Sequence, residues 1–308
     1  MNIESKLHPA EFKKFCRKEL SGDMNALEKE RIKYITGTVV CAVISIIMFI
    51  ISGILYYNNN FSYEFETYIG ITFPLGSLFI IGSCASVKLY KTKAKKLILQ
   101  KLLSYIGDFK ISANKINLSY VKSLKLFDYF NRYSCDDSIT GSYGLLNLDI
   151  SELHLKKVVR TRKHTHTVTI FQGILVCFKS LKKYSGYTVV KNNGISLFAG
   201  KEKVNLEDPE FEQYYDVYSS DQVEARYLLT SSFMNRMVQL AKKNRAGNIT
   251  ISFEHGNVNL AIESSKDWFE IPILKPATRI ENYRAIVFEL INILKIIDSL
   301  KMEQNIGL

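Results

Sequence analysis

Two histidines of this 308-residue sequence have a spacing that is compatible with binding a metal ion. His164 and His166 are two residues apart, so on a strand both imidazoles would lie on one face and could bind the same metal ion. Further ligands would have to come from elsewhere, for example from His154 or Asp136. The alternative is a basic hairpin end that faces solvent. Two ligands do not make a site, so we expect no metal and no cofactor.

Oxygen-bearing side chains form a second candidate group, at Asp136, Asp137, Ser138 and Thr140. Hard cations bind such oxygens, but the spacing is not that of an EF-hand loop, and no Glu follows at the position that such a loop requires. Asp and Ser side chains also bond to their own backbone in turns. A turn is therefore the simpler interpretation.

A third group comprises Asp221, Glu224 and Arg226, which we place on a short helix. Asp221 and Glu224 can share one helix face and act as an acid/base pair. The alternative is structural, because acids in a first turn interact with the helix dipole and Arg226 can close an ion pair. An enzyme that combines this group with the Asp136/Asp137 loop stays an alternative function. We assign no catalytic residue.

The strongest charge signal lies between Glu152 and Lys203, where the chain has eleven Lys and Arg residues and two acids. Each basic residue near anionic lipid contributes about 1 kcal/mol to binding, so a few contacts would hold a domain on a membrane. The alternative is a merely solvated basic surface. The candidate lipid-binding residues form two clusters, which are Lys156, Lys157, Arg160, Arg162 and Lys163, and Lys179, Lys182 and Lys183.

Two long uncharged stretches precede all of these groups in the chain and determine where in the cell the groups lie. Ile35–Tyr57 contains 23 residues without a charge and Thr67–Val87 contains 21, and a bilayer crossing needs roughly 20 helical residues. A buried core helix usually carries charges on one face, and neither stretch does. We therefore predict a transmembrane hairpin within residues 35–90, with spans at about 35–57 and 67–88.

The basic residues around the spans predict their orientation. Residues 1–34 carry eight Lys and Arg residues, the loop 58–66 carries none, and basic residues resume after the second span. Basic flanks stay on the cytoplasmic side, so both termini are expected in the cytoplasm of a bacterial cell, with the protein in its inner membrane. Five cysteines without a C-x-x-C pair agree with a reducing compartment.

Periodicity predicts an α+β chain in four parts. Residues 1–34 form an amphipathic segment with a helix at Pro9–Leu20, which lies either in the membrane plane or against the cytoplasmic domain. The hairpin comes next, and residues 91–133 form a helical stalk. Residues 134–308 form an antiparallel β-rich domain closed by a helix at Arg279–Met302. The expected strands are Leu145–Ile150, Val168–Phe178, Tyr187–Val190, Ile195–Phe198, Ile249–Phe253, Val258–Ile262 and Trp268–Ile273.

A set of short motifs follows in order along the second half of the chain. Asp137–Gly141, Phe171–Gly173, Glu207–Glu212 and Glu224–Thr230 come first, and Ser252-Phe253 and Phe269-Glu270 follow. In these motifs the chain resembles an uncharacterised bacterial family with two N-terminal spans and a cytoplasmic α+β domain of unknown function. The resemblance implies this architecture and carries over no active site.

The function expected from these features is that of a membrane-anchored, non-enzymatic binding module. Its partners would be the lipid bilayer, anionic lipid headgroups, a protein or a second copy of the chain. A net charge of +11 also suits nucleic acid, but no recognised motif supports that partner. The alternatives are the enzyme described above and a subunit of a larger membrane assembly.

Overall fold

The computed structural model describes residues 6–58, 63–161, 164–193, 202–243 and 249–302. The chain divides into two compact units. The first comprises Met1–Leu102 and Glu270–Val287, and the second comprises Leu103–Phe269 and Phe288–Leu308. The fold class is α+β, as predicted, with long apolar helices first, then an antiparallel sheet, then a C-terminal helix.

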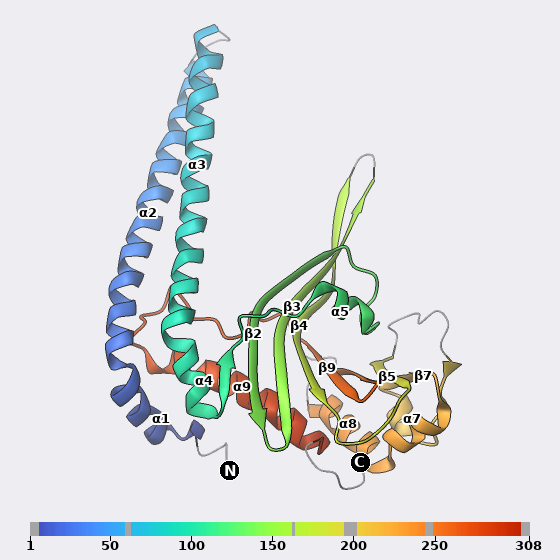
Figure 1. Ribbon diagram of the computed structural model, residues 1–308. Coiled ribbons are helices and arrows are strands. Elements are labelled where there is room, and N and C mark those ends of the chain that lie inside the picture. The colour runs from blue at the N-terminus through green and yellow to red at the C-terminus, as the bar shows by residue number, and fades with distance from the viewer. Residues whose placement is uncertain (1–5, 59–62, 162–163, 194–201, 244–248, 303–308) are drawn as a thin grey trace. The chain divides into compact units, whose positions relative to one another are not determined.

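The first unit is dominated by two long helices, α2 and α3, which lie side by side (Figure 1). Ser21–Asn58 forms α2 and Tyr63–Ala94 forms α3, so each helix contains one of the predicted spans. The flanking helical segments are α1 (Pro9–Phe15) and η2 (Cys16–Leu20) before α2, and η3 (Lys95–Leu99) and α4 (Gln100–Ile106) after α3.

Small and polar residues bring α2 and α3 together. A Cβ atom added to Gly76 would lie 3.3 Å from the ring of Phe49, so the missing side chain makes room for that ring. The Oγ of Ser45 donates to the carbonyl of Gly76 at 3.0 Å, and the Oγ of Ser83 donates to that of Thr38 at 3.3 Å. Such close approach and interhelical bonding are typical of paired membrane helices.

The segment Glu270–Val287 is bonded to the charged ends of these helices. Glu28 forms an ion pair with Arg31 at 2.7 Å and also accepts a hydrogen bond from the amide of Ala277 at 2.5 Å. Glu270 pairs with Lys95 at 2.6 Å and with Lys91 at 2.9 Å. Burial acts to raise the pKa of Glu270, but the two lysines outweigh it and lower that pKa.

The amphipathic stripe of the first helix is buried. Phe12, Cys16 and Leu20 are at most 1% exposed, whereas a helix lying in the membrane plane would present this face to lipid. The structure therefore supports the packing alternative for this segment.

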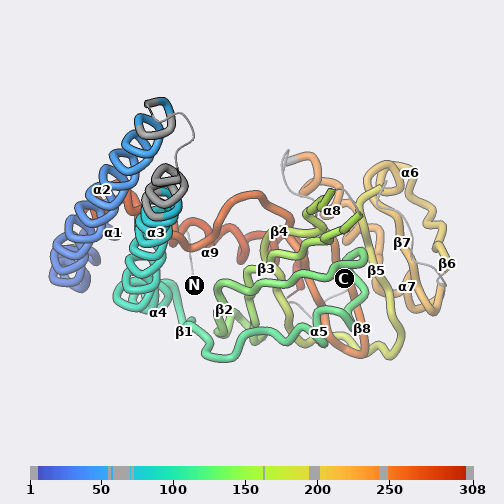
Figure 2. The backbone as a smooth tube through the Cα atoms, turned by 90° about the horizontal axis from the view of Figure 1, so that it is seen from above, coloured from blue at the N-terminus to red at the C-terminus, as the bar shows by residue number. Residues whose placement is uncertain are grey.

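The second unit is built on an antiparallel sheet. Within the described residues, nine strands are ordered β1-β2-β3-β4-β9-β8-β5-β7-β6 (Figures 1 and 2). The strands are β1 (Phe109–Ile111), β2 (Arg132–Tyr143), β3 (Leu146–Arg160), β4 (Thr165–Lys179), β5 (Tyr187–Asn192), β6 (Glu202–Lys203), β7 (Tyr215–Ser219), β8 (Ile249–Glu254) and β9 (Asn257–Glu263).

Helices cover both faces of the sheet. Short α5 (Leu118–Ser123) and the chain after it cover one face and form an apolar core there with Leu153, Leu175 and Val189. Figure 2 shows α8 (Ser231–Lys243) on the other side of the strands, where the part of α9 (Ile280–Leu300) from Phe288 onward also lies. The remaining helices are α6 (Pro209–Glu212) and α7 (Gln222–Leu228).

Three local predictions differ from the structure. Asp136 and Asp137 do not form a loop but lie in β2, at a bulge between Cys135 and Ser138. The helical part of the expected stalk ends at Ile106, and β1 and the short α5 follow. Trp268–Ile273 is not a strand, because the amides of Trp268 and Phe269 bond to carboxylate side chains instead of a neighbouring strand. The strand expected at Ile195–Phe198 lies outside the described residues.

Candidate functional site

Strand β3 places Glu152 and His154 on one face of the sheet. They are two residues apart, and the apolar Leu153 and Leu155 point to the opposite core. Glu152 is buried, with 3% of its surface exposed, and the side chain of His154 is 16% exposed. The β2 bulge lies beside them and brings the carboxylate of Asp136 within 3.5 Å of the His154 Nε2 atom.

The loop after β9 adds Asp267 to this group. The amide of Trp268 donates to Glu152 Oε1 at 3.0 Å, and the amide of Phe269 donates to Glu289 on α9 at 2.6 Å. Lys266 forms an ion pair with the same Glu289. Phe269 takes a left-handed backbone conformation with φ of 56°, which is costly for a bulky residue. The hydrogen bonds of the Trp268 and Phe269 amides to the two carboxylates stabilise this conformation. The backbone that follows Asp267 is therefore bonded to side chains of β3 and α9.

Glycine makes room for this loop at the end of β9. Gly173 in β4 has φ of 152°, and an added Cβ would lie 2.1 Å from the carbonyl oxygen of Ile262. Only glycine fits such an approach. Next to it, the amide of Ser264 donates to the carbonyl of Gln172 at 2.8 Å. The Gly of the Phe171–Gly173 motif thus lets β9 pass close to β4 just before the loop begins.

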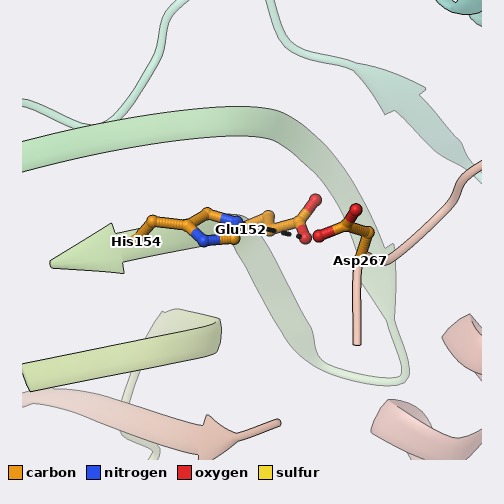
Figure 3. Close-up of side chains that lie close together, drawn as sticks. All are labelled: Glu152, His154 and Asp267. Carbon is orange, nitrogen blue, oxygen red and sulfur yellow. Dashed lines mark ion pairs between the residues drawn. The ribbon is translucent and has the colours of Figure 1, made fainter. Parts of the chain in front are cut away.

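Glu152, His154 and Asp267 converge on one point (Figure 3). One ligand atom from each residue lies within 4.8 Å of those of the other two. The His154 Nε2 atom is 3.6 Å from Glu152 Oε1, is itself buried, and makes no hydrogen bond within the described part of the chain. An imidazole with two or three carboxylates is a donor set that suits a divalent transition metal.

The structure separates the histidines that the sequence analysis considered together. His164 lies in the β3–β4 turn, and His166 pairs with Val159 near the far end of β4, whereas His154 pairs with Gln172. The rings of His164 and His166 have centroids 6.3 Å apart and are exposed. Both sit in the basic hairpin end described above, which agrees with the solvent-facing alternative. Of the proposed ligands, His154 and Asp136 do lie together.

Asp221 and Glu224 have structural partners. The side chain of Asp221 caps α7 by accepting from the amides of Val223 and Glu224, at 2.8 and 3.1 Å. The Glu224 carboxylate accepts from the amides of Ser185 and Gly186, at 3.0 and 2.9 Å. The structural alternative therefore describes both acids.

Arg226 does not pair with either acid, and its guanidinium contacts the carbonyls of Gln222 and Asn205 at 3.4 and 3.5 Å. Helix α7 follows β7, whereas Asp136 and Asp137 lie on β2, six positions away in the sheet. The residues of the enzyme alternative are not brought together.

The two basic clusters lie at opposite ends of β4. Lys156, Lys157 and Arg160 belong to the projecting end of the β3–β4 hairpin, and Lys179 lies at the other end, where it pairs with Asn257. Fifteen residues of strand separate these ends by roughly 45 Å. Arg162 and Lys163 lie outside the described residues. Lys182 lies near Lys179, with its Nζ 4.5 Å from the ring centre of Tyr227, and the exposed Lys183 follows it.

A cavity of about 390 Å³ lies on the α5 side of the sheet. Thr140, Asp149 and Cys177 line it, in register across β2, β3 and β4. The Tyr120 hydroxyl at its edge donates to Asn259 at 3.0 Å. Burial raises the pKa of Asp149, and it raises the pKa of the Cys177 thiol to about 12. The thiol is therefore protonated at neutral pH, which suits a polar binding cavity better than a nucleophile.

Sequence reasoning missed Glu152 and Asp267. Alternation of polar and apolar residues through 152–155 carries the signal for Glu152, because it places Glu152 and His154 on the same face. No local sequence pattern indicates that Asp267, which lies 113 residues after His154, belongs to the site. Only the tertiary fold brings it to the site.

A comparison with known families gives one match, within the second half of the chain. Residues 169–302 match the family described as Protein of unknown function (DUF3137). The matched part runs from β4 through α9 and includes Asp267, whereas Glu152, His154, α2 and α3 precede it. The match supports the resemblance to an uncharacterised family over this part of the chain.

Other comparisons add little. No curated protein matches the chain. Among solved structures, the mycobacterial trehalose monomycolate transport factor A, TtfA, aligns with a TM-score of 0.28 and 10% identity, over 58% of this chain and 92% of the other. A likeness of that size establishes neither a shared fold nor a shared function.

Proposed function

We propose that this chain is a membrane-anchored binding module of non-enzymatic function, held by α2 and α3 and docked on anionic lipid headgroups by its β-rich unit. Two helices are long and apolar enough to cross a membrane, at Pro9–Ile54 and Phe73–Ile106. The observation that carries the anchor is their exposure, since only 11% of the most apolar window of each is buried. A core helix of a soluble protein is mostly buried instead.

The exposed side chains are large and apolar. Ile46, Ile50 and Ile54 lie on one face of α2 and are 54–58% exposed. On α3, Leu78 and Ile81 are 61% and 64% exposed. Leaving such surface in water costs about 25 cal/mol per Å², and lipid removes this cost.

The proposed topology follows from charge. Lys and Arg residues flank the outer sides of both spans, and the connection between the spans contains none. Both termini would then lie in the cytoplasm of a bacterial cell and the protein in its inner membrane. The β-rich unit, with its helical connection to α3, would also be cytoplasmic.

The proposed lipid contact is the arm formed by the ends of β3 and β4, Lys157–Arg160 and Thr165–Val168. These residues pair with each other, and among the described residues no third strand extends along them. The arm and its base carry Lys156, Lys157 and Arg160 without an acid, and Val159 and Val168 are 40% and 52% exposed. Cations beside exposed apolar groups suit an anionic membrane surface.

Alkaline carbonate extraction of membranes tests the anchor, because it removes peripheral proteins and leaves integral ones. We expect the chain to stay with the membrane until detergent is added. Release by carbonate or salt would contradict the anchor. Protease treatment of sealed inverted vesicles should digest the β-rich unit, and protection of that unit would contradict the topology.

Hydrogen exchange of the full chain in nanodiscs tests the lipid contact. We expect residues 157–168 to exchange more slowly with anionic than with zwitterionic lipid, and the difference to disappear in Lys156→Glu/Arg160→Glu. Lys179→Glu/Lys183→Glu makes the same charge change with exposed residues at the other end of β4 and serves as the control. An equal effect of both variants would show a general charge effect and not docking by the arm.

The second candidate function is a subunit of a larger membrane assembly, bound to a protein partner or to a second copy. The exposed faces of α2 and α3 favour it, because other helices could cover them as lipid does. Cross-linking in native membranes distinguishes the two, since an assembly gives discrete larger species.

A further inference from the structure

We propose that Glu152, His154 and Asp267, with Asp136 beside them, bind one divalent transition-metal ion such as Zn²⁺ or Mn²⁺. The site is separate from the arm and from the anchor helices. It uses side chains from β2, β3 and the loop after β9, all within the second compact unit.

The first argument is distance. Nitrogen and oxygen ligands lie about 2.0–2.2 Å from zinc, so two ligands of a tetrahedral ion are roughly 3.4 Å apart. The His154 Nε2 atom lies 3.5 Å from Asp136 Oδ2 and 3.6 Å from Glu152 Oε1. These separations are longer than ordinary hydrogen bonds and match ligands that share an ion. The ligand atom of Asp267 lies within 4.8 Å of those of Glu152 and His154, and the residue is exposed.

The second argument is the state of the His154 nitrogen. Its Nε2 atom is buried, faces two carboxylates and makes no hydrogen bond within the described residues. A neutral acceptor nitrogen pointing at carboxylate oxygens is repulsive unless a positive charge lies between them. A metal ion supplies that charge, and a proton on His154 is the competing explanation.

The third argument is charge balance. The carboxylate oxygens of Glu152 and Asp267 lie within 4.8 Å of each other, and Glu152 is almost completely buried. Like charges this close repel each other. A divalent ion would balance the acids that converge here.

The mixed donor set selects the class of metal. Calcium and magnesium prefer oxygen ligands alone, whereas an imidazole nitrogen suits zinc or iron, and carboxylates beside it also accept manganese. Exposure of Asp267 leaves one side of the group open to solvent. An ion there would keep a water-accessible position, which is the arrangement of a reactive site as well as of a ligand-binding one.

Trp268 makes the site measurable. It is the one tryptophan of the sequence, its amide bonds to Glu152, and it follows Asp267 directly. A paramagnetic ion bound to Asp267 would therefore quench the tryptophan fluorescence of the whole chain.

The test uses the full chain in mild detergent, stripped with a chelator and titrated with Mn²⁺, with Zn²⁺ content measured by elemental analysis after dialysis. We expect saturable quenching, one zinc per chain, and a loss of affinity of at least about 10-fold in Asp267→Asn and in Glu152→Gln. Asp267 is exposed, and the amide oxygen introduced by Glu152→Gln still accepts from the Trp268 amide. Both variants should therefore fold, which near-ultraviolet circular dichroism checks.

The control is the arm variant His164→Gln/His166→Gln, which removes the exposed His166 of the arm and the exposed His164 in the turn next to it. We expect this variant to bind like the natural chain. The proposal is overturned if the natural chain neither binds zinc nor responds to 1 mM Mn²⁺, as a protonated His154 would predict. It is also overturned if the arm variant loses binding while Asp267→Asn retains it.

Discussion

The carboxylate of Glu224 holds the backbone of Gly186. Glu224 Oε1 accepts from the Gly186 amide at 2.9 Å, and a Cβ added to Gly186 would lie 2.5 Å from that oxygen. Oε2 accepts from the preceding amide, that of Ser185, at 3.0 Å. A side chain of α7 therefore fixes the turn that leads into β5, and its charge is satisfied by the backbone.

Replacement of Glu224 by Gln should lower the free energy of unfolding by about 1–3 kcal/mol, because one amide loses its acceptor and faces an NH₂ group. Denaturation of the full chain in detergent, followed by circular dichroism, measures this. Arg226→Gln is the matched control on the same helix, and its longer contacts predict a change within about 0.5 kcal/mol. A larger effect of the Arg226 variant would contradict this assignment.

Gly173→Ala should destabilise the second unit by at least about 2 kcal/mol. The added methyl group would meet the carbonyl of Ile262, which is backbone and cannot rotate away, and the φ of 152° is unfavourable for alanine. The midpoint of urea unfolding measures the loss. Gly22→Ala in α2 is the control, since nothing lies within 4 Å of its Cβ position, and it should be neutral or slightly stabilising. Equal midpoints for the two variants would refute the close approach of β9.

Gly76→Val should weaken the pairing of α2 and α3 by about 1–3 kcal/mol, because its side chain would overlap the ring of Phe49. The thermal midpoint in detergent should fall. Phe49→Leu, combined with Gly76→Val, should recover part of it by providing space. Gly82→Val on the same helix has open space around it and should leave the midpoint nearly unchanged. Absence of any rescue would argue against this contact.

Acid should loosen the bonds between Glu270–Val287 and the helix ends. The pKa of Glu270 is lowered from its ordinary value of 4.5, since Lys95 and Lys91 outweigh the effect of burial. Its stabilising contribution is therefore complete above about pH 4.5 and is lost as the pH falls through the lowered folded-state pKa. Thermal midpoints between pH 3 and pH 7 should show this fall. Glu270→Gln should flatten the pH profile, and an unchanged profile would contradict the assignment.

Sequence patterns correctly predicted the helices and strands that have long uncharged stretches or regular apolar alternation. The uncharged stretches became α2 and α3, and β8 and β9 begin and end within one residue of their predicted bounds. Strand β3 runs ten residues beyond its predicted end at Ile150, because the consecutive polar residues Ser151 and Glu152 interrupt the apolar alternation directly after Ile150.

Only part of the candidate metal site could be predicted from the sequence. His154 and Asp136 were considered as ligands, but in partnership with His164 and His166, which lie elsewhere on the hairpin. Pairing between β2 and β3 and a bulge bring Asp136 to His154, and a loop bound to α9 brings Asp267. Register, bulges and loop anchoring arise from long-range contacts, which residue spacing along one chain does not encode locally.

The first part of β4 is an edge strand on one side, and this exposed edge gives the protein a tendency to self-associate outside its native environment. From Thr165 to Phe171 its outer edge faces no strand within the described residues, and its side chains are β-branched or aromatic with no acid or lysine. Such an edge is a template on which another chain can add a strand. When the arm is not bound to lipid headgroups, we expect fibrillar self-association to start at Thr165–Phe171.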